Sequence, residues 1–427
     1  MMNLNSICET LHKGQEKLSL QNANQKNKAL NAVALALDKN RQQILDANKI
    51  DIELARKNGM TESLIDRLSL DNKKIDGIIA SIRAVISQSD PIDEEICGWK
   101  TPNGLTIRQI RVPIGVIAII YESRPNVTAD AFCLAYKSGN SILLRGSSSA
   151  INSNKEIVKI IKQGLSSQEA EGFGIPEAIE LAPCESHDEV QQILTATGKI
   201  DLALPRGGAK LIKMVVETAK VPVIETGSGV CHLYIDDDSD LEMAAKIAEN
   251  AKIQRPGVCN AIECIVINKK IAGQFLPLLA QKFAGRVKFH ADCESFKILS
   301  EIEKTNGRSQ NVIEATESDF GYEYLDYECC IKTVSDITEA VKYINSHNTK
   351  HSESIITNNR QHALYFQKSI DASCVYVNAS TRFTDGGEFG FGTELGISTQ
   401  KLHARGPMGI KALTTTKYLI DGEGQIR

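Results

Sequence analysis

Short apolar runs alternate with longer segments of helical spacing from Val116 onward, and this alternation constrains the fold more than any other feature. Runs of this kind cover residues 116–120, 141–144, 202–204 and 223–225. Strands that recur between helices favour a parallel sheet that is covered on both faces. The sequence therefore predicts an α/β fold. A chain of 427 residues also exceeds one ordinary core, so two or three domains are expected.

The charge and cysteine content exclude several classes of protein. With 49 basic and 53 acidic residues the net charge is -4, so we expect neither a nucleic acid nor an anionic membrane as a partner. The amino terminus lacks a signal-peptide pattern, and no apolar run has the length of a membrane span. The eleven cysteines are scattered, without a C-x-x-C pair or zinc spacing, so we expect reduced thiols, a cytoplasmic protein and no metal site.

One cysteine stands in a position suited to covalent catalysis. Cys259 follows a Pro-Gly turn in the stretch 254–260 and precedes the apolar run 261–267, which predicts a buried strand. A turn that ends in such a strand exposes one side chain on a rigid scaffold, as a nucleophile requires. The nearby Arg255 could raise the thiolate fraction. The alternative is a small buried hydrophobic residue, the usual fate of a free cysteine.

A second segment could hold a phosphate group. Residues 204–210 run from a predicted strand through Gly207 and Gly208 into a predicted helix, with Arg206 beside them. Free backbone N–H groups at a helix start bind anions. The full G-x-G-x-x-G pattern is absent and Gly-Gly also forms ordinary turns, so both interpretations stay open.

Two segments far apart in the sequence predict an association surface. Asn103-Gly104 lies between two extended segments, which is a strong hairpin signal. The tail 412–420 has strand-type residues and no neighbour in sequence, so it must pair with a distant segment. We expect the hairpin and the tail to form a subunit contact together. The alternative is that the tail completes a sheet within its own subunit. The glycine-rich stretch 381–409 is interpreted as a functional loop.

A family resemblance rests on several of these stretches. The turn 221–227, which contains Glu225, precedes Cys259 in an order that resembles the aldehyde dehydrogenase superfamily. Further stretches resemble its glutamate-5-semialdehyde dehydrogenase (gamma-glutamyl phosphate reductase) branch, in one register over essentially the whole chain: 112–126, 254–260, 351–353, 378–383 and 389–398.

The resemblance implies an aldehyde dehydrogenase-like fold with two Rossmann-like parallel-sheet domains and a small oligomerisation hairpin and tail. We expect residues 1–95 and 114–250 to bind NADP and residues 251–380 to form the catalytic domain with the nucleophilic Cys259. Residues 96–113 and 408–427 would be the hairpin and tail. A homodimer or homotetramer is implied, and docking of a glutamate 5-kinase stays open.

The resemblance implies reduction of L-glutamyl 5-phosphate by NADPH to L-glutamate 5-semialdehyde and phosphate, a step of L-proline biosynthesis. Cys259 would form the thioester, and Asn126 with the Cys259 N–H would form the oxyanion hole. Glu225 matches a hydrolytic base of the superfamily. The alternatives are a hydrolytic NAD-linked aldehyde dehydrogenase and a non-enzymatic scaffold; the latter is opposed by the presence of all three residues.

The resemblance also implies binding residues. Arg145 stands where the superfamily carries a lysine, and arginine suits the 2′-phosphate of NADP; a surface arginine at a strand end is the alternative. Glu323 would contact the nicotinamide ribose, although Leu-Asp replaces Phe-Gly after it. Ser147, Gly207 and Gly208 complete the predicted coenzyme site. The substrate carboxylate and phosphate require cations and donors, and the candidates are Arg124, Arg255, Ser380 and Arg382.

Overall fold

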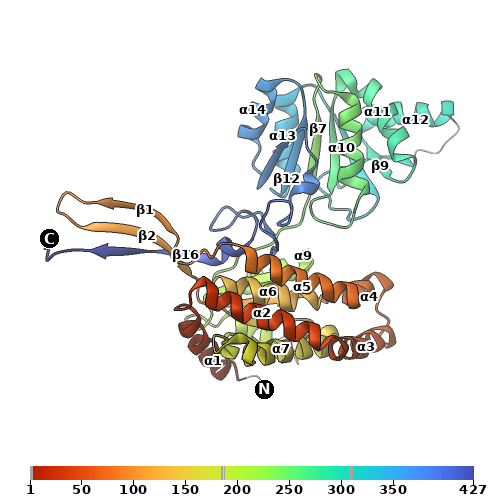
Figure 1. Ribbon diagram of the computed structural model, residues 1–427. Helices are drawn as coiled ribbons and strands as arrows, with labels where there is room; N and C mark the ends of the chain where they lie inside the picture. Colours follow the sequence, from red (N-terminus) through yellow and green to blue (C-terminus); the bar gives the residue numbers. More distant parts are fainter. Residues whose placement is uncertain (1–2, 184–185, 187, 307–310) are drawn as a thin grey trace. The chain divides into compact units, whose positions relative to one another are not determined.

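The computed structural model describes residues 3–183, 186, 188–306 and 311–427 (Figure 1). The chain forms two compact units. The first comprises Met1–Thr226, Gly390–Gly396 and Met408–Arg427, and the second comprises Gly227–Phe389 and Ile397–Pro407. Each unit contains a parallel sheet with helices against it, which confirms the predicted α/β class.

The first unit begins with helices whose apolar faces form part of its core. Asn22 and Gln25 form a reciprocal capping box that begins the second helix. Asp71 caps the fifth helix, whose isoleucines at 75, 78, 79 and 82 are buried. The helices are α1 (Leu4–Leu18), α2 (Ala23–Lys39), α3 (Arg41–Lys57), α4 (Glu62–Leu68) and α5 (Asn72–Ser87).

A four-stranded parallel sheet of order β5-β4-β3-β6 forms the centre of the first unit. All six residues of β3 are buried, as the apolar run predicted. The strands are β3 (Val116–Tyr121), β4 (Ser141–Arg145), β5 (Ile179–Leu181) and β6 (Leu202–Arg206). The helices between and after them are α6 (Asn126–Lys137), α7 (Ile151–Leu165), α8 (Asp188–Leu194) and α9 (Ala209–Thr218).

The predicted strand 223–225 is wrong. Val223 makes one isolated bridge to Ala203, and the chain then leaves the sheet. Two backbone hydrogen bonds hold this bridge, from Ala203 N–H to the Pro222 oxygen and from Ile224 N–H to the Ala203 oxygen. Pro222 has no N–H with which to extend the ladder, so the pairing ends after one residue.

The first unit also carries a three-stranded antiparallel sheet of order β1-β2-β16. The Asn-Gly hairpin is confirmed, because β1 (Glu95–Lys100) and β2 (Thr106–Pro113) flank it. Strand β16 (Thr414–Asp421) pairs with all of β2, and Figure 1 shows the three strands side by side. The tail thus pairs with a distant segment, as predicted, but that segment belongs to its own chain.

The second unit is built on a seven-stranded sheet of order β10-β9-β11-β8-β7-β12-β13, in which every pairing is parallel. Every residue of β8 is buried, which confirms the predicted strand after Cys259. The strands are β7 (Cys231–Ile235), β8 (Ile262–Asn268), β9 (Lys288–Ala291), β10 (Val312–Glu314), β11 (Glu328–Val334), β12 (Ser352–Ile356) and β13 (Cys374–Val377). A short pair, β14 (Ile397–Ser398) and β15 (Gly406–Pro407), lies outside this sheet.

Helices cover both faces of the seven-stranded sheet. Leu233 and Ile265 face one apolar cluster, and their strand neighbours Tyr234 and Val266 face the other. This alternation follows from the two-residue period of a strand. The helices are α10 (Leu241–Ile253), α11 (Lys269–Phe283) and α12 (Cys293–Asn306) toward the first cluster, with α13 (Ile337–His347) and α14 (Arg360–Ser369) toward the second.

The boundary between the two units lies earlier in the chain than predicted, so residues 227–250 belong to the second unit. We expected them in the first domain, but β7 pairs with both β8 and β12, and α10 packs on the same sheet. The division falls at Thr226, before that central strand. Among the described residues, no helix has the length and apolar character needed to cross a bilayer.

Candidate active site

Cys259 lies in the loop between α10 and β8, and its backbone is held firmly while the residue is only partly buried. Its carbonyl oxygen accepts a hydrogen bond from the Cys231 thiol at 3.2 Å. A Cβ atom on Gly229 would lie 1.6 Å from the same oxygen, so only glycine permits this approach. A fixed backbone with a partly accessible thiol is the arrangement that a nucleophile needs.

Two of the predicted substrate-binding residues, Arg255 and Arg382, lie close enough for their charges to act on each other, and Arg382 also interacts electrostatically with Cys259. Arg382 follows β13 and donates from Nε to the Gln254 side-chain oxygen at 3.1 Å. Its guanidinium also donates to the Asn260 side-chain oxygen. Burial lowers the pKa of Arg382 and the positive charge of Arg255 lowers it further, whereas acidic groups including the Cys259 thiolate raise it. The structure therefore brings Cys259, Arg255 and Arg382 into one neighbourhood.

Ser380 begins the turn that carries Arg382. Its hydroxyl oxygen accepts the Arg382 N–H at 3.3 Å, and Ser380 is buried. This is an N-cap contact, so the structure gives Ser380 a role in holding the turn. Its contact with substrate stays a prediction.

Glu323 is tied to the loop that packs on Cys259. Its carboxylate accepts the Gly229 N–H at 2.6 Å, and burial raises the pKa of Glu323. This hydrogen bond supports the nucleophile loop through Gly229. The predicted contact of Glu323 with the nicotinamide ribose stays a prediction.

Four residues around this loop were not singled out from sequence. Lys252 and Glu263 form a buried ion pair at 2.5 Å, and Glu263 also accepts the Leu325 N–H at 3.2 Å. Burial raises the pKa of Glu263 to about 7 against the opposing attraction of Lys252. The Lys252–Glu263 pair could have been predicted, because each charged residue stands within an apolar stretch of the sequence. Asn260 and Cys231 carried no local signal, because their partners are distant in sequence.

The first unit contains the other predicted catalytic side chains. Asn126 is the first residue of α6, and its side-chain amide donates to Asp130 at 3.1 Å, which orients it. Burial raises the pKa of Asp130. Glu225 is partly exposed in the loop after Val223. The oxyanion role of Asn126 and the role of Glu225 stay predictions. Arg124, just before α6, is held through its N–H to the Glu122 carbonyl at 2.7 Å.

A pocket of about 310 Å³ opens at the carboxyl ends of β3 and β4 in the first unit. Its lining includes Arg145 and Ser147, two of the predicted coenzyme residues, together with Glu122 and Leu211. The Arg145 guanidinium donates to the Gly146 oxygen at 3.1 Å and to the Ser186 oxygen at 3.2 Å. Its buried Nε has no hydrogen-bond partner within the described residues. An unpaired buried donor in a pocket of this size fits an anionic ligand.

Gly207 and Gly208 precede α9 as predicted, but a carboxylate already lies at that helix start. The Gly208 N–H donates to the Glu122 side chain at 3.1 Å. A Cβ on Gly207 would lie 2.6 Å from the Glu122 carboxyl carbon. Glu122 is an anion at a helix N-terminus, the same kind of interaction that was predicted for phosphate. A phosphate at these glycines would have to displace Glu122.

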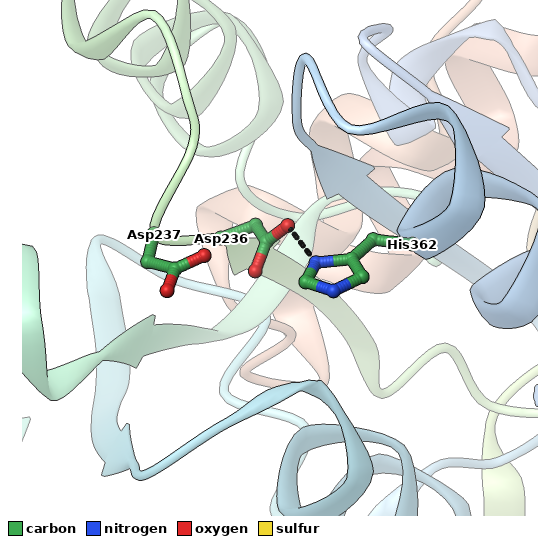
Figure 2. A group of neighbouring side chains, drawn as sticks. All are labelled: Asp236, Asp237 and His362. Carbon is green, nitrogen blue, oxygen red and sulfur yellow. Dashed lines mark hydrogen bonds and ion pairs between the residues drawn. The ribbon is translucent and has the colours of Figure 1, made fainter.

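Three further side chains of the second unit lie together: Asp236, Asp237 and His362, with ligand atoms within 4.8 Å of one another (Figure 2). Buried Asp236 accepts from Thr357 at 2.7 Å and lies 2.6 Å from His362 Nδ1. Asp237 pairs with Lys270 at 2.6 Å. Hydrogen bonds and an ion pair within the protein explain this cluster, and we assign no metal to it.

Comparisons with known proteins give one consistent result. A family model described as the aldehyde dehydrogenase family matches residues 2–295 and 329–418. A gamma-glutamyl phosphate reductase of Dictyoglomus thermophilum is 50% identical over 429 residues, which cover 99% of this chain and 100% of that protein. One from Clostridium novyi is 51% identical over 412 residues, 96% of this chain and 95% of that protein. The crystal structure of a gamma-glutamyl phosphate reductase from Thermotoga maritima, at 44% identity, superposes with a TM-score of 0.94 and covers 100% of both chains.

Proposed function

Since this chain belongs to the aldehyde dehydrogenase family and to its gamma-glutamyl phosphate reductase branch, we propose that it reduces L-glutamyl 5-phosphate to L-glutamate 5-semialdehyde and phosphate. The observation that carries the proposal is Cys259, held on its loop with two arginines acting nearby, in a chain that matches such reductases over its full length. An acyl phosphate is dianionic at its leaving group, and Arg255 and Arg382 supply complementary charge. The product feeds L-proline biosynthesis.

The residues support a thioester mechanism. The Cys259 thiolate attacks the acyl carbon, phosphate leaves, and the acyl group stays on sulfur. The family resemblance assigns the tetrahedral oxyanion to the Cys259 backbone N–H and the Asn126 side chain, and we adopt that assignment as part of the proposal. After hydride reaches the acyl carbon, the sulfur-bound hemiacetal collapses and releases aldehyde and thiolate. Water must be excluded, because hydrolysis of the thioester would waste the substrate.

We propose NADPH as the coenzyme. It supplies the hydride when bound. The pocket at the ends of β3 and β4 supports this choice, because the buried Nε of Arg145 has no partner among the described residues and its planar guanidinium suits a 2′-phosphate. Ser147 adds a hydroxyl to the same lining. We further propose a cytoplasmic location, where thiols such as Cys259 stay reduced.

The test is the reverse reaction with glutamate semialdehyde. We expect NADP reduction that requires inorganic phosphate, because phosphate must attack the thioester to regenerate the thiolate. NAD reduction that proceeds equally well without phosphate would instead establish the hydrolytic alternative.

The role of Glu225 separates the two mechanisms. A phosphate-dependent reductase needs no activated water, so Glu225→Gln should reduce activity by less than about tenfold, far less than the loss of the nucleophile. The measurement is the steady-state rate of both variants, with mass spectrometry for trapped thioester. Equal losses in both variants, with thioester accumulating in Glu225→Gln, would contradict the proposal.

We propose that the sheet β1-β2-β16 joins two subunits in a homodimer or homotetramer. An isolated three-stranded sheet buries little on its own, and its exposed apolar side chains favour a partner. Trp99 and Tyr418 pack edge to face at 6.1 Å, yet they are 47% and 55% exposed, and Ile420 is 58% exposed.

Removal of the tail tests this contact. A chain that ends after Lys411 loses β16 and should dissociate to monomers, as measured by light scattering. Lys417→Ala, a change in the same strand outside the apolar group, should leave the assembly intact. A monomeric full-length protein, or a truncated chain with unchanged mass, would show that the sheet serves only its own subunit.

A further inference from the structure

Asn260, the residue after the nucleophile, is 5% exposed and bonded through its side chain and its carbonyl. Its amide nitrogen donates to the Thr384 oxygen at 2.9 Å and to the Arg382 oxygen at 3.3 Å. Its side-chain oxygen accepts from the Arg382 guanidinium, and its carbonyl accepts from Thr381 Oγ1 at 2.7 Å. All these partners lie in one turn, so Asn260 joins the Cys259 loop to that turn.

The turn itself is anchored to the sheet. Thr384 Oγ1 lies 2.7 Å from Ser352 Oγ on β12 and 2.7 Å from the Tyr376 hydroxyl on β13. The Ser352 contact is buried and the Tyr376 contact is partly buried. A hydrogen bond is stronger inside the protein than in water, so these contacts hold the turn in place. The turn therefore gives Asn260 a fixed frame.

Arg382 depends on this frame for its position. Within the described residues its guanidinium donates to two side chains, those of Gln254 and Asn260, and Asn260 is the buried one of the two. Arg255 is exposed on the loop that carries Cys259, and its positive charge repels the Arg382 guanidinium. Without the Asn260 contact, the guanidinium would keep one solvent-exposed hydrogen bond to Gln254, and such contacts are weak. The carboxylates of Asp385 and Glu388 also attract it, but a charge attraction without a direct contact does not fix the geometry of the guanidinium.

We propose that Asn260 is a positioning residue that holds the Arg382 guanidinium beside the Cys259 thiol, so that an anionic reactant is drawn to the nucleophile. This inference rests on the proposed role of Cys259 as nucleophile. It assigns Asn260 no contact with substrate. Its effect is transmitted through Arg382.

The test compares how fast Cys259 reacts with iodoacetate, which is anionic, and with iodoacetamide, which is neutral and similar in size. The rates are followed on the Cys259 peptide by mass spectrometry, which separates it from the other cysteines. A fixed cation favours the anionic reagent, so Asn260→Ala should lower the iodoacetate-to-iodoacetamide rate ratio on the order of fivefold. Arg382→Met should lower it by a similar factor.

Two further variants keep the test decisive. Asn260→Asp retains an acceptor for Arg382 but adds a negative charge beside the thiol, so it should lower the ratio at least as much as alanine. Asn268→Ala is the matched control: Asn268 is also buried, its side chain accepts the Lys270 N–H at 3.0 Å, and it ends β8, about 20 Å from the start of that strand. This control should leave the ratio unchanged.

The proposal is overturned if Asn260→Ala leaves the ratio unchanged, if Asn268→Ala lowers it equally, or if Arg382→Met has no effect. Turnover supplies a second readout: Asn260→Ala should raise KM for phosphate in the reverse reaction more than it lowers kcat. Alkylation does not depend on turnover. A wild-type enzyme without phosphate-dependent activity would therefore refute the proposed function, while a lowered ratio in Asn260→Ala would still support the positioning role.

Discussion

Cys259→Ala is expected to abolish turnover. Covalent catalysis through a thioester has no route without the sulfur, so the loss of kcat should be on the order of 10⁴ or more. The loop itself should survive, because its anchors use the Cys259 carbonyl and the side chain of Asn260, which alanine leaves in place. Coenzyme binding should also persist, since Arg145 and its pocket belong to the other unit.

The measurement is phosphate-dependent NADP reduction, with circular dichroism and coenzyme titration to verify the fold. Cys293→Ala is a suitable control, because Cys293 is also a free thiol, is exposed, and begins α12 away from the nucleophile loop. It should retain wild-type activity. A Cys259→Ala enzyme with a tenth of wild-type activity would rule out this cysteine as the nucleophile.

Arg145→Ala should weaken the use of NADPH selectively. Charge-assisted hydrogen bonds are worth ~1.5 to 3 kcal/mol, so KM for NADPH should rise roughly ten- to a hundredfold. KM for NADH should change little, because NADH lacks the 2′-phosphate. The structural basis for this expectation is the buried Nε of Arg145, which has no hydrogen-bond partner in the described part of the chain.

Two comparisons make the result specific. Arg145→Lys keeps the charge but loses the planar fork, so its KM for NADPH should lie between those of wild type and Arg145→Ala. Arg41→Ala removes an arginine that pairs with Asp38 and Asp76 on the helical surface, and it should leave both KM values unchanged. Similar penalties for NADPH and NADH in Arg145→Ala would assign Arg145 to the ribose or to packing.

Much of the fold was predictable because local patterns report local environment. The apolar run after Cys259 predicted a buried strand, and β8 is buried throughout because it lies inside a seven-stranded sheet. The Asn-Gly pair predicted the β1–β2 hairpin because its turn preference is local. The strand predicted at 223–225 was wrong, because pairing along a ladder depends on the neighbouring strand as well as on composition.

The sequence by itself determined the α/β class, the turn that presents Cys259, and the family to which the chain belongs. Tertiary structure alone decided that β16 pairs with β2 and that β7 joins the second sheet. It also decided that Asn260 holds Arg382, and that Glu122 lies at the glycines where phosphate was expected. Each of these contacts joins segments far apart along the chain. Their partners are selected by the closure of long loops and by packing of the whole unit, which periodicity within a short window does not encode.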